Sequence, residues 1–402
     1  MLLPPDLKEW VAGNDLVHFV VEAVGMCDMG KAEVNSRGTG DRQYPPWMML
    51  ALLIYSYASG TFSSRRIERQ SYESVAVRYV CANTHPDHDT IAKFRRENAE
   101  LIQECFVKVL ELARELGLLR LGTITMDGTK IKARAARQRT LESRELEREV
   151  RRCLQEARRA DESDDPSAGG TLLPAELGTP CARLARLREA QQRLAARQAQ
   201  REQDPPRPGS GPPRVNTTDP DSALQPTAQG PFIQGYNGQL CTTSEGVTLI
   251  VGCRVTANTN DRQQMAPNVQ AIDPRLGCPE TILSDTGFDN SSQIQTLQSQ
   301  GLQVLCPPQK GALPSAAGRP ARRSALRQTI FDERAKRRAL MDSAEGRRLY
   351  NRRAPSIEPV FHVLKNIIGF GRFSLRGLKK VSLEWKLLAL AFNCRKLAAQ
   401  RA

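Results

Sequence analysis

Three acidic residues stand where carboxylates often carry out chemistry. Asp127 follows Ile-Thr-Met in a run rich in Ile, Thr and Leu, which predicts a β-strand over residues 119–133. Asp285 follows a short predicted strand over 280–284, and Glu358 lies at the start of a predicted helix. Because functional sites collect at strand ends in open α/β sheets, we expect the three side chains to converge. Converging carboxylates supply the hard oxygen ligands that divalent cations prefer.

Two such cations about 4 Å apart can activate water or a 3′-hydroxyl and stabilise the leaving oxygen of an in-line phosphoryl transfer. The alternative for each carboxylate is structural, since an Asp that follows a strand is often a turn residue or a helix cap. A second candidate, His85 and His88 in the sequence HPDH, could form a metal pair. No partner ligands are evident for these histidines, which favours a turn.

The positive charge is concentrated at the C-terminal end of the chain. The 402 residues carry 58 Lys and Arg against 44 Asp and Glu, a net charge of +14. From residue 310 onward there are 22 Lys and Arg against 6 Asp and Glu, so the rest of the chain is slightly acidic. A one-sided excess of this kind predicts a polyanionic partner, with nucleic acid first and an anionic membrane surface second.

Several classes of protein are disfavoured by composition. The ten cysteines show no CxxC or similar ligand spacing, which argues against a zinc site and favours reduced thiols in a cytosol. The longest apolar run, residues 47–58, is too short to span a bilayer. Charged residues interrupt the apolar residues of the N-terminus, so no signal peptide is predicted. We therefore expect a cytoplasmic protein with no membrane partner.

The elements that must position the acids follow from hydrophobic periodicity and caps. The first 118 residues read as helical, with helices predicted over 47–58, 64–70 and 72–81 and from Asp89, a predicted N-cap, to Leu112. Residues 64–100 are also compatible with a helix–turn–helix. Charged helices with two leucine stripes follow over 137–201, then a Pro/Gly linker over 204–214. We predict a self-packed antiparallel helix pair, with a dimer zipper as the alternative.

Beyond residue 232 the pattern becomes mixed. The predicted elements are a hairpin turning at 244–246, a helix over 263–272, a strand over 280–284, a helix over 291–300, a strand over 302–306, a loop over 310–328 and a last helix over 382–399. Without the inserted helices, three consecutive strands precede alternating helices and strands. That element order matches an RNase H-like α/β core.

The segments around the three acids resemble the DDE transposases of bacterial insertion sequences. The matching segments are MDGTKIKA around Asp127, LSDTGFDN around Asp285 and YNRRAPSIEPVFHVLKNIIGFGRFSLRGLKKVSLEW around Glu358. FIQGYNGQ and VTANTNDRQQMAP are also similar to family segments. The N-terminal segments YPPWMMLALLIYSYASGTFSSRRIERQ and HPDHDTIAKFRREN resemble the helical module that precedes the core in such transposases.

The third segment carries the most specific pattern. Tyr350, Arg353, Glu358 and Lys365 resemble the family's Tyr–Arg–Glu–Lys signature. Six residues separate Glu358 from Lys365, as in that signature, and four separate Arg353 from Glu358, where the usual pattern has three. Glu358 and Lys365 are two helical turns apart, so we expect them to share a face. Lys365 would then reach a DNA phosphate beside the metals.

The resemblance implies an RNase H-like catalytic core with a helical N-terminal domain and a helical insertion after the first core strand. It implies an N-terminal DNA-binding domain over 1–118, the first part of the core over 119–135, the insertion and linker over 136–231, and the rest of the core with basic helices over 232–402. Asp127, Asp285 and Glu358 would ligate two Mg²⁺, or Mn²⁺ in vitro. Tyr350, Arg353, Lys365, Arg372 and Arg376 would contact DNA.

The activity implied by the resemblance is cleavage of phosphodiester bonds at the element ends, followed by joining of the 3′-hydroxyl to target DNA. The partners would be the terminal inverted repeats, the target duplex and a second copy of the chain in a synaptic complex, within the bacterial cytoplasm and its nucleoid. One alternative is a catalytically inactive or domesticated transposase-derived protein that only binds DNA. Another is a nuclease with the same core that never joins strands.

Overall fold

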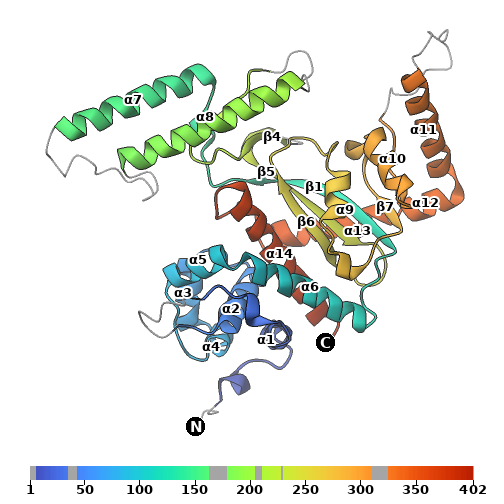
Figure 1. Cartoon of the computed structure of the whole chain (residues 1–402). Coiled ribbons are helices and arrows are strands. Elements are labelled where there is room, and N and C mark those ends of the chain that lie inside the picture. Colours follow the sequence, from blue (N-terminus) through green and yellow to red (C-terminus); the bar gives the residue numbers. More distant parts are fainter. Residues whose placement is uncertain are drawn as a thin grey trace.

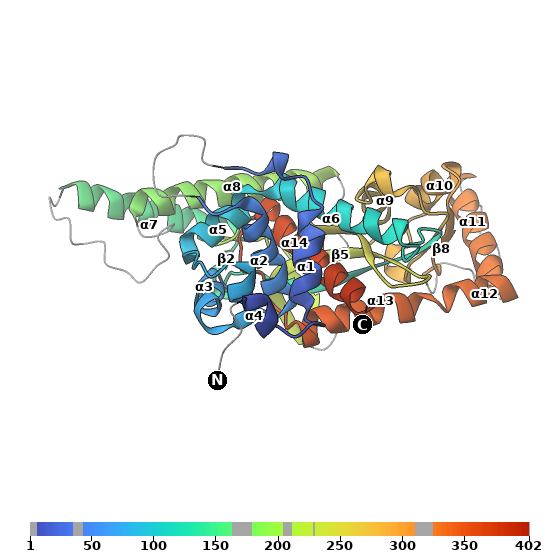
Figure 2. The same cartoon turned by 90° about the horizontal axis from the view of Figure 1, so that it is seen from below.

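The computed structural model describes residues 6–34, 43–162, 179–203, 211–227, 230–309 and 325–401. A mixed β-sheet lies at the centre, with helices around it (Figure 1). A helix pair, α7 (Ser143–Glu162) and α8 (Pro180–Gln203), projects at one end of the molecule. Two helices, α11 (Ala325–Asp342) and α12 (Ala344–Tyr350), stand at the opposite end in both views (Figure 2).

The N-terminal part of the described chain is helical, as predicted. Its α-helices are α1 (Leu16–Gly25), α2 (Pro46–Ala58), α3 (Ser64–Glu73), α4 (Val75–Val80), α5 (His88–Glu97) and α6 (Ala99–Glu115). Pro46 occupies the first turn of α2, where the missing N–H costs no hydrogen bond. Every residue of α2 from Met48 to Ile54 is buried. The predicted apolar run therefore forms the centre of this helical part.

Two details of the helical part differ from the sequence prediction. Helix α5 begins at His88 because the Asp87 carboxylate, and not that of Asp89, caps it by accepting the backbone N–H groups of Asp89 and Thr90, both at 2.9 Å. The single helix predicted to run to Leu112 is broken at Asn98, where α5 ends and α6 begins. The Asn98 side chain accepts the backbone N–H of Glu33 at 2.8 Å, which fixes the break.

The histidine pair takes part in helix packing. His88 Nδ1 lies 2.8 Å from Glu68 Oε2, and His85 Nδ1 lies 3.1 Å from the Ser71 hydroxyl. The His85 ring also stacks on Tyr72, with the ring centroids 3.9 Å apart. These contacts join α3 to the first residue of α5 and to the segment before it. They support the structural alternative for the histidines over a metal pair.

The central sheet is six-stranded and is built around β1. Its strands are β1 (Thr123–Lys132), β4 (Ala223–Thr227), β5 (Gly230–Thr243), β6 (Ile250–Thr256), β7 (Thr281–Leu283) and β8 (Gln303–Leu305). The order is β4-β5-β1-β7-β8, with β6 also paired to β5. β1, β5 and β6 are antiparallel neighbours, whereas β7 is parallel to β1 and β8 is parallel to β7.

The register of β1 bears directly on Asp127. β1 pairs antiparallel with β5, and Asp127 lies opposite Leu240. β1 pairs in parallel with β7 only as far as Thr125, which lies opposite Leu283. Asp127, predicted near the end of its strand, is in the middle of β1 but lies just beyond the end of its parallel pairing.

The insertion forms the predicted helix pair, with a small core of its own. Leu146 and Cys153 of α7 pack with Leu187, Ala190 and Leu194 of α8 and with Val215. A short ribbon closes the insertion at its base, where β2 (Thr140–Leu141) pairs antiparallel with β3 (Val215–Asn216). Residues 204–210 of the predicted linker lie outside the described residues. The mutual packing of the leucine stripes favours the self-packed pair over a dimer zipper.

The remaining described helices and turns are α9 (Met265–Gln270), α10 (Ser291–Ser299), α13 (Arg353–His362), a π-helical turn η7 (Val363–Ile367), α14 (Leu378–Ala398) and the 3₁₀ turns η1 (Leu7–Trp10), η2 (Met29–Lys31), η3 (Arg137–Arg139), η5 (Pro274–Leu276) and η6 (Thr286–Phe288). The predicted loop over 310–328 falls largely outside the described residues, and its last part is helical because α11 begins at Ala325. The last helix starts earlier than predicted, directly after Gly377, whose φ of 81° ends the preceding loop.

Helix α14 packs against the sheet through Trp385. Its indole Nε1 donates to the Gln239 carbonyl at 3.0 Å. A Cβ at Gly238 would lie 2.9 Å from the Trp385 ring, so the glycine makes room for the indole. One hydrophobic core runs from the N-terminal helices through the sheet to α14.

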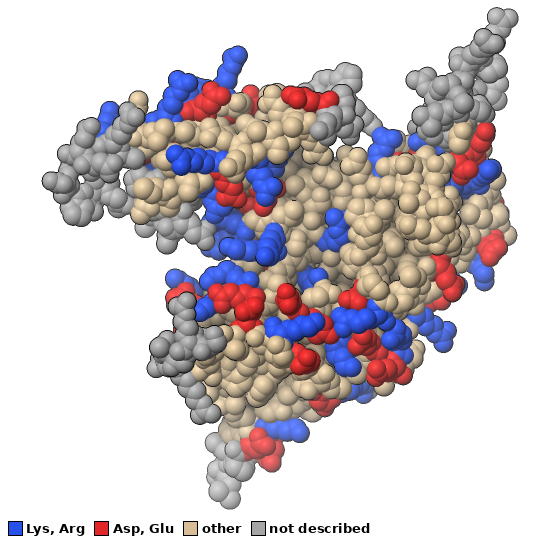
Figure 3. Space-filling model, in the orientation of Figure 1, with Lys and Arg blue, Asp and Glu red and all other residues tan. Residues whose placement is uncertain are grey.

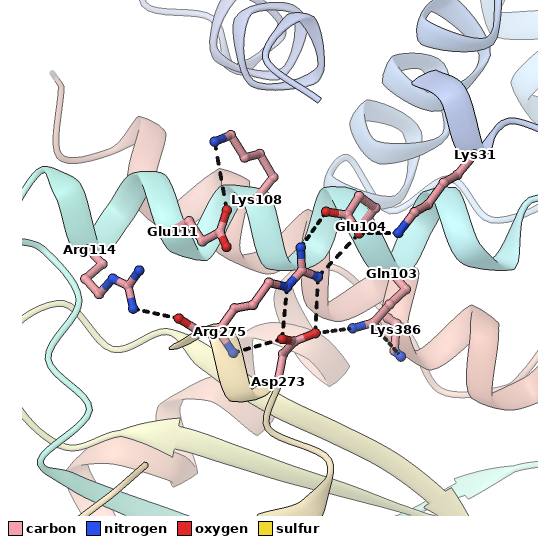
Figure 4. A network of polar contacts seen from close by, with 9 residues as sticks. All are labelled: Lys31, Gln103, Glu104, Lys108, Glu111, Arg114, Asp273, Arg275 and Lys386. Atoms are coloured by element: carbon pink, nitrogen blue, oxygen red, sulfur yellow. Dashed lines mark hydrogen bonds and ion pairs between the residues drawn. The ribbon is translucent and has the colours of Figure 1, made fainter. Parts of the chain in front are cut away.

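Charged side chains join the N-terminal helices to the sheet domain (Figure 4). Arg275 of η5 lies 2.6 Å from Glu104 of α6 and 3.0 Å from Asp273, and Lys31 approaches the same Glu104 at 2.8 Å. Arg114, near the end of α6, donates to the Arg275 carbonyl at 2.7 Å. Hydrogen bonds from Arg275 and Lys31 lower the pKa of Glu104. The helical part and the sheet are therefore held together by packing and by charge. Within the described part of the chain, none of the helices is long and apolar enough to cross a membrane.

Candidate active site

Asp127 and Asp285 lie side by side at one edge of the sheet. Each comes two residues after the last parallel pair of β1 and β7, Thr125 and Leu283. The Asp285 carboxylate caps η6 by accepting the backbone N–H of Gly287 at 2.9 Å. Burial raises the pKa of Asp127 to about 7, and the neighbouring Asp285 carboxylate contributes to that rise. Two of the three predicted acids therefore meet, as the topology of parallel strands requires.

Helix α13 lies over this edge and brings a cation to Asp127. The Ser356 hydroxyl hydrogen-bonds to that of Thr125 at 2.7 Å, which fixes α13 against β1. One turn earlier on α13, Arg353 Nη2 donates to Asp127 Oδ2 at 2.9 Å. The Arg353 and Asp127 side chains are only 15% and 19% exposed, so this is a largely desolvated ion pair. Arg353, predicted to bind DNA, here balances the charge of Asp127.

Glu358 is not beside the two aspartates. It lies in the middle of α13, where it was expected at the start of a helix, and its side chain is 66% exposed. Its Oε1 is 4.0 Å from Arg353 Nη1, a loose contact. Five residues along an α-helix correspond to a rotation of about 140° between Arg353 and Glu358, whereas the four residues of the usual signature give about 40°. The extra residue therefore puts Ile357, which is fully buried, on the inner face and turns Glu358 outward.

Two other residues of the signature do face the site. The Tyr350 hydroxyl, at the end of α12, donates to the Ser284 carbonyl at 3.3 Å, directly before Asp285. Lys365 lies in the π-helical turn η7. Burial lowers the pKa of Lys365, and the Asp127 carboxylate opposes that change. Both side chains therefore contribute to the surroundings of the aspartate pair.

A third aspartate, Asp261, belongs to this site and was missed by the sequence analysis. Its carboxylate accepts the side-chain amides of Asn237 at 2.7 Å and Gln239 at 2.5 Å, both from β5. A Cβ at Gly128 would lie 2.5 Å from Asp261 Oδ1, so the glycine after Asp127 lets Asp261 approach β1. The segment VTANTNDRQQMAP, which contains Asp261, was the available signal.

Lys130 adds a buried amine to the same cluster. Its Nζ is buried and has no hydrogen-bond partner among the described residues. Burial lowers the pKa of Lys130, while the carboxylates of Asp261, Asp127 and Asp285 raise it. The site therefore holds three carboxylates and several cations at close quarters, which is the electrostatic pattern of a functional centre.

Arg372 and Arg376, the other predicted DNA contacts, lie elsewhere. The backbone of Arg372 forms a parallel β-bridge with Lys132. Lys132 is the last residue of β1, five residues after Asp127. The Arg376 Nε donates to the Arg134 carbonyl at 3.0 Å. Both arginines line a cleft between the helical insertion and the sheet.

Comparison with known protein families agrees with this arrangement. Residues 214–394 match the model of the transposase DDE domain, and residues 6–97 match a transposase domain (DUF772). Together the two matches cover more than half of the chain. The chain belongs to the insertion-sequence DDE transposases. No curated protein and no solved structure matched this transposase.

DDE transposases use divalent metals, and the donor set of this transposase suits them. Asp127 and Asp285 present hard oxygen atoms at one sheet edge, where a divalent cation would relieve their mutual repulsion. As the side chains stand, no group of three His, Cys, Asp or Glu residues in the described part of the chain could hold a metal ion. Glu358, the third predicted ligand, has a 66% exposed side chain and lies away from the two aspartates.

Proposed function

We propose that this transposase cleaves phosphodiester bonds at the ends of its element and joins the 3′-hydroxyl to target DNA by two-metal catalysis. The observation that carries the proposal is the pairing of Asp127 and Asp285 at the carboxyl edge of β1 and β7, in a chain matched by a transposase DDE domain. The strand order β6-β5-β1-β7-β8, with the first three strands antiparallel and the last two parallel to β1, supports an RNase H-like core.

In this proposal Asp127, Asp285 and Glu358 bind two Mg²⁺, with Mn²⁺ able to replace them. The metals would activate the attacking oxygen and stabilise the leaving one. Arg353 holds the Asp127 carboxylate at 2.9 Å and is placed to release it when a divalent cation competes for the same oxygen. Lys365, held in a half-buried position near Asp127, would fix a phosphate of the reacting strand.

The wider assembly is also proposed from the family. Residues 1–118 would recognise the terminal inverted repeats. Residues 119–135 and 232–402 would form the catalytic core around the insertion and linker at 136–231. Two copies of the chain would hold two element ends in one synaptic complex. The protein would act in the cytoplasm, at the nucleoid.

The test uses the full chain and duplexes that carry the inverted repeats flanking its coding DNA. Strand cleavage and strand transfer are followed with Mg²⁺, with Mn²⁺ and with a chelator. We expect metal-dependent cleavage that Asp285→Ala abolishes while end binding persists, because the basic surface is untouched. Near-normal cleavage by Asp285→Ala would overturn the assignment.

A second candidate function is DNA binding without cleavage, as in an inactive or domesticated transposase. The exposed position of Glu358 favours it. Mn²⁺ binding separates the two candidates independently of activity. For a metal-dependent enzyme, Mn²⁺ should raise the melting temperature of the wild type but not that of Asp127→Asn. The second candidate predicts no response in either protein and no cleavage under any condition.

A further inference from the structure

A basic cleft separates the helical insertion from the sheet. It encloses about 610 Å³. Helix α8 contributes Arg183 and Arg186, the loop before α14 contributes Arg372 and Arg376, and the stretch 132–139 contributes four more Lys and Arg residues. Glu149 of α7 is the one acidic residue among those found lining the cleft in the described part of the chain. Figure 3 shows Lys and Arg side chains gathered around the hollow between the insertion and the rest of the molecule.

The insertion is fixed in place beside this cleft. Arg197 of α8 donates to the backbone carbonyls of Pro220 at 3.1 Å and Ser222 at 2.9 Å. Arg193, one turn earlier, lies 2.8 Å from Asp221 Oδ1, and Asp221 Oδ2 accepts the backbone N–H of Leu378 at 2.8 Å. Helix α8 is thereby tied to the first residue of α14.

Arg183 and Arg186 lie on the same face of α8 as this attachment, because residues 183, 186, 190, 193 and 197 follow the three-to-four spacing of one helix face. Arg183 pairs with Glu156 at 3.1 Å and Arg186 with Glu189 at 2.8 Å. All four side chains are partly exposed, and ion pairs of this kind are weak. Phosphate oxygens can therefore replace the glutamates as partners of the two arginines.

We propose that the insertion is a DNA-binding clamp, and that this cleft holds the phosphate backbone of a DNA duplex between α8 and the loop before α14. The inference rests on the proposed function and assigns to the insertion a role that the sequence analysis did not. A groove lined by one sign of charge concentrates a polyanion. The guanidinium groups of the arginines on both walls can each donate two hydrogen bonds to a phosphate. A DNA duplex offers one phosphate charge per about 1.7 Å of its length.

The position of the cleft sets which part of the duplex it holds. Lys132 lies five residues beyond Asp127 on β1, and at about 3.3 Å per residue the two are about 17 Å apart. With about 3.4 Å of rise per base pair, that separation is about five base pairs. For a duplex that lies along β1, the clamp thus contacts phosphates roughly half a helical turn from the carboxylate site.

The test measures affinity of the full chain for an arbitrary-sequence duplex of about 30 base pairs as salt is varied, because phosphate contacts carry no sequence information. The Arg183→Ala/Arg186→Ala variant should reduce the slope of log affinity against log salt by up to about 1.8. The matched control is Arg148→Ala/Arg188→Ala, which removes the same charge from exposed positions on α7 and α8 outside the cleft. We expect the control to keep the wild-type slope.

Arg183→Lys/Arg186→Lys keeps the charge and should restore most of the slope, which shows that the slope depends on the positive charge at these two positions. If the alanine pair and its control change the slope equally, the clamp is refuted while DNA binding and the proposed function stand. If the wild type binds no duplex, the proposed function itself fails. Preference for single-stranded RNA over the duplex at equal salt would also overturn the clamp.

Discussion

The buried charge of Asp289 offers a sharp test of how the active-site loop, the segment after β7 that contains Asp285 and Asp289, is held in place. Asp289 follows η6, four residues after Asp285, and its side chain is fully buried. Arg337 of α11 donates to Asp289 Oδ1 at 2.9 Å and also to the Cys306 carbonyl at 3.2 Å. Arg334 lies 3.0 Å from Asp289 Oδ2. Helix α11 is thus fastened to the loop after β7 and to the end of β8 by one ionic cluster.

In Asp289→Ala, α11 should detach from the loop after β7 and from the end of β8 far more often than in the wild type. The Arg337 side chain is 3% exposed, so loss of the aspartate leaves a buried guanidinium without its counter-charge. Breaking a buried ion pair by removing one partner costs about 3–5 kcal/mol. Since about 1.4 kcal/mol corresponds to a factor of ten, the open population should rise at least about 100-fold.

Labelling of Cys306 measures this opening directly. The Cys306 side chain is buried, and burial raises the pKa of its thiol to about 11, so the closed form reacts slowly. Labelling in native buffer, read at Cys306 by peptide mass spectrometry, follows the open population when reclosing is fast. The control is Arg338→Ala, an exposed neighbour on α11, which should change the rate by a few-fold at most.

A double-mutant cycle completes the test. Asp289→Ala and Arg337→Ala each break the same pair, so their combined effect should fall well short of the product of the single effects. Additive effects, or a labelling rate for Asp289→Ala within about fivefold of the wild type, would refute the argument that this ion pair holds α11 on the active-site loop.

Three further predictions concern the site and the core. Because burial raises the pKa of Asp127 to about 7 from 3.8, its ionisation destabilises the fold as pH rises between those values. The melting temperature of Asp127→Asn relative to the wild type should therefore be higher at pH 8 than at pH 5, and an equal difference at both would contradict this. Lys365→Ala should slow single-turnover cleavage about 100-fold at saturating protein with little loss of DNA affinity, and the reverse pattern would make Lys365 an ordinary surface contact. Gly238→Ala should lower the free energy of unfolding by about 1–3 kcal/mol, because the new Cβ would clash with Trp385. Gly13→Ala is the control in thermal unfolding and should be nearly neutral, since a Cβ there meets nothing within 4 Å.

The positions of Asp127 and Asp285 could be predicted because each follows a local β-rich run. A general rule of sheet topology then brings the ends of parallel strands together. The insertion could be predicted for a similar reason, since its leucine stripes pack on each other and need little from the rest of the chain. In both cases the decisive interactions are encoded by spacing along a short segment.

Glu358 and Asp261 show why the rest could not be predicted. The orientation of Glu358 depends on which face of α13 packs on β1, and that is fixed by Ser356 contacting Thr125. Asp261 lies in an irregular segment, and its place depends on the Asn237 and Gln239 side chains of β5. Such contacts form only after segments that are distant in the sequence have packed together, so no pattern in the local sequence indicates them.

The placement of the insertion also bears on how the protein folds. β1 and β5 are neighbours in the sheet, yet Lys132 pairs with Gly235, about one hundred residues later. Closing so long a loop opposes the pairing entropically, and pairings between distant residues fold slowly. The β2–β3 ribbon joins Thr140 to Asn216, and the helix pair it closes has its own core, so this unit can form first. Once it has formed, a much shorter loop remains to be closed, because Lys132 lies eight residues before Thr140 and Gly235 lies nineteen residues after Asn216. During synthesis the folded insertion thus shortens the loop that must close before β1 and β5 can pair. The pairing can therefore form soon after β5 has been made.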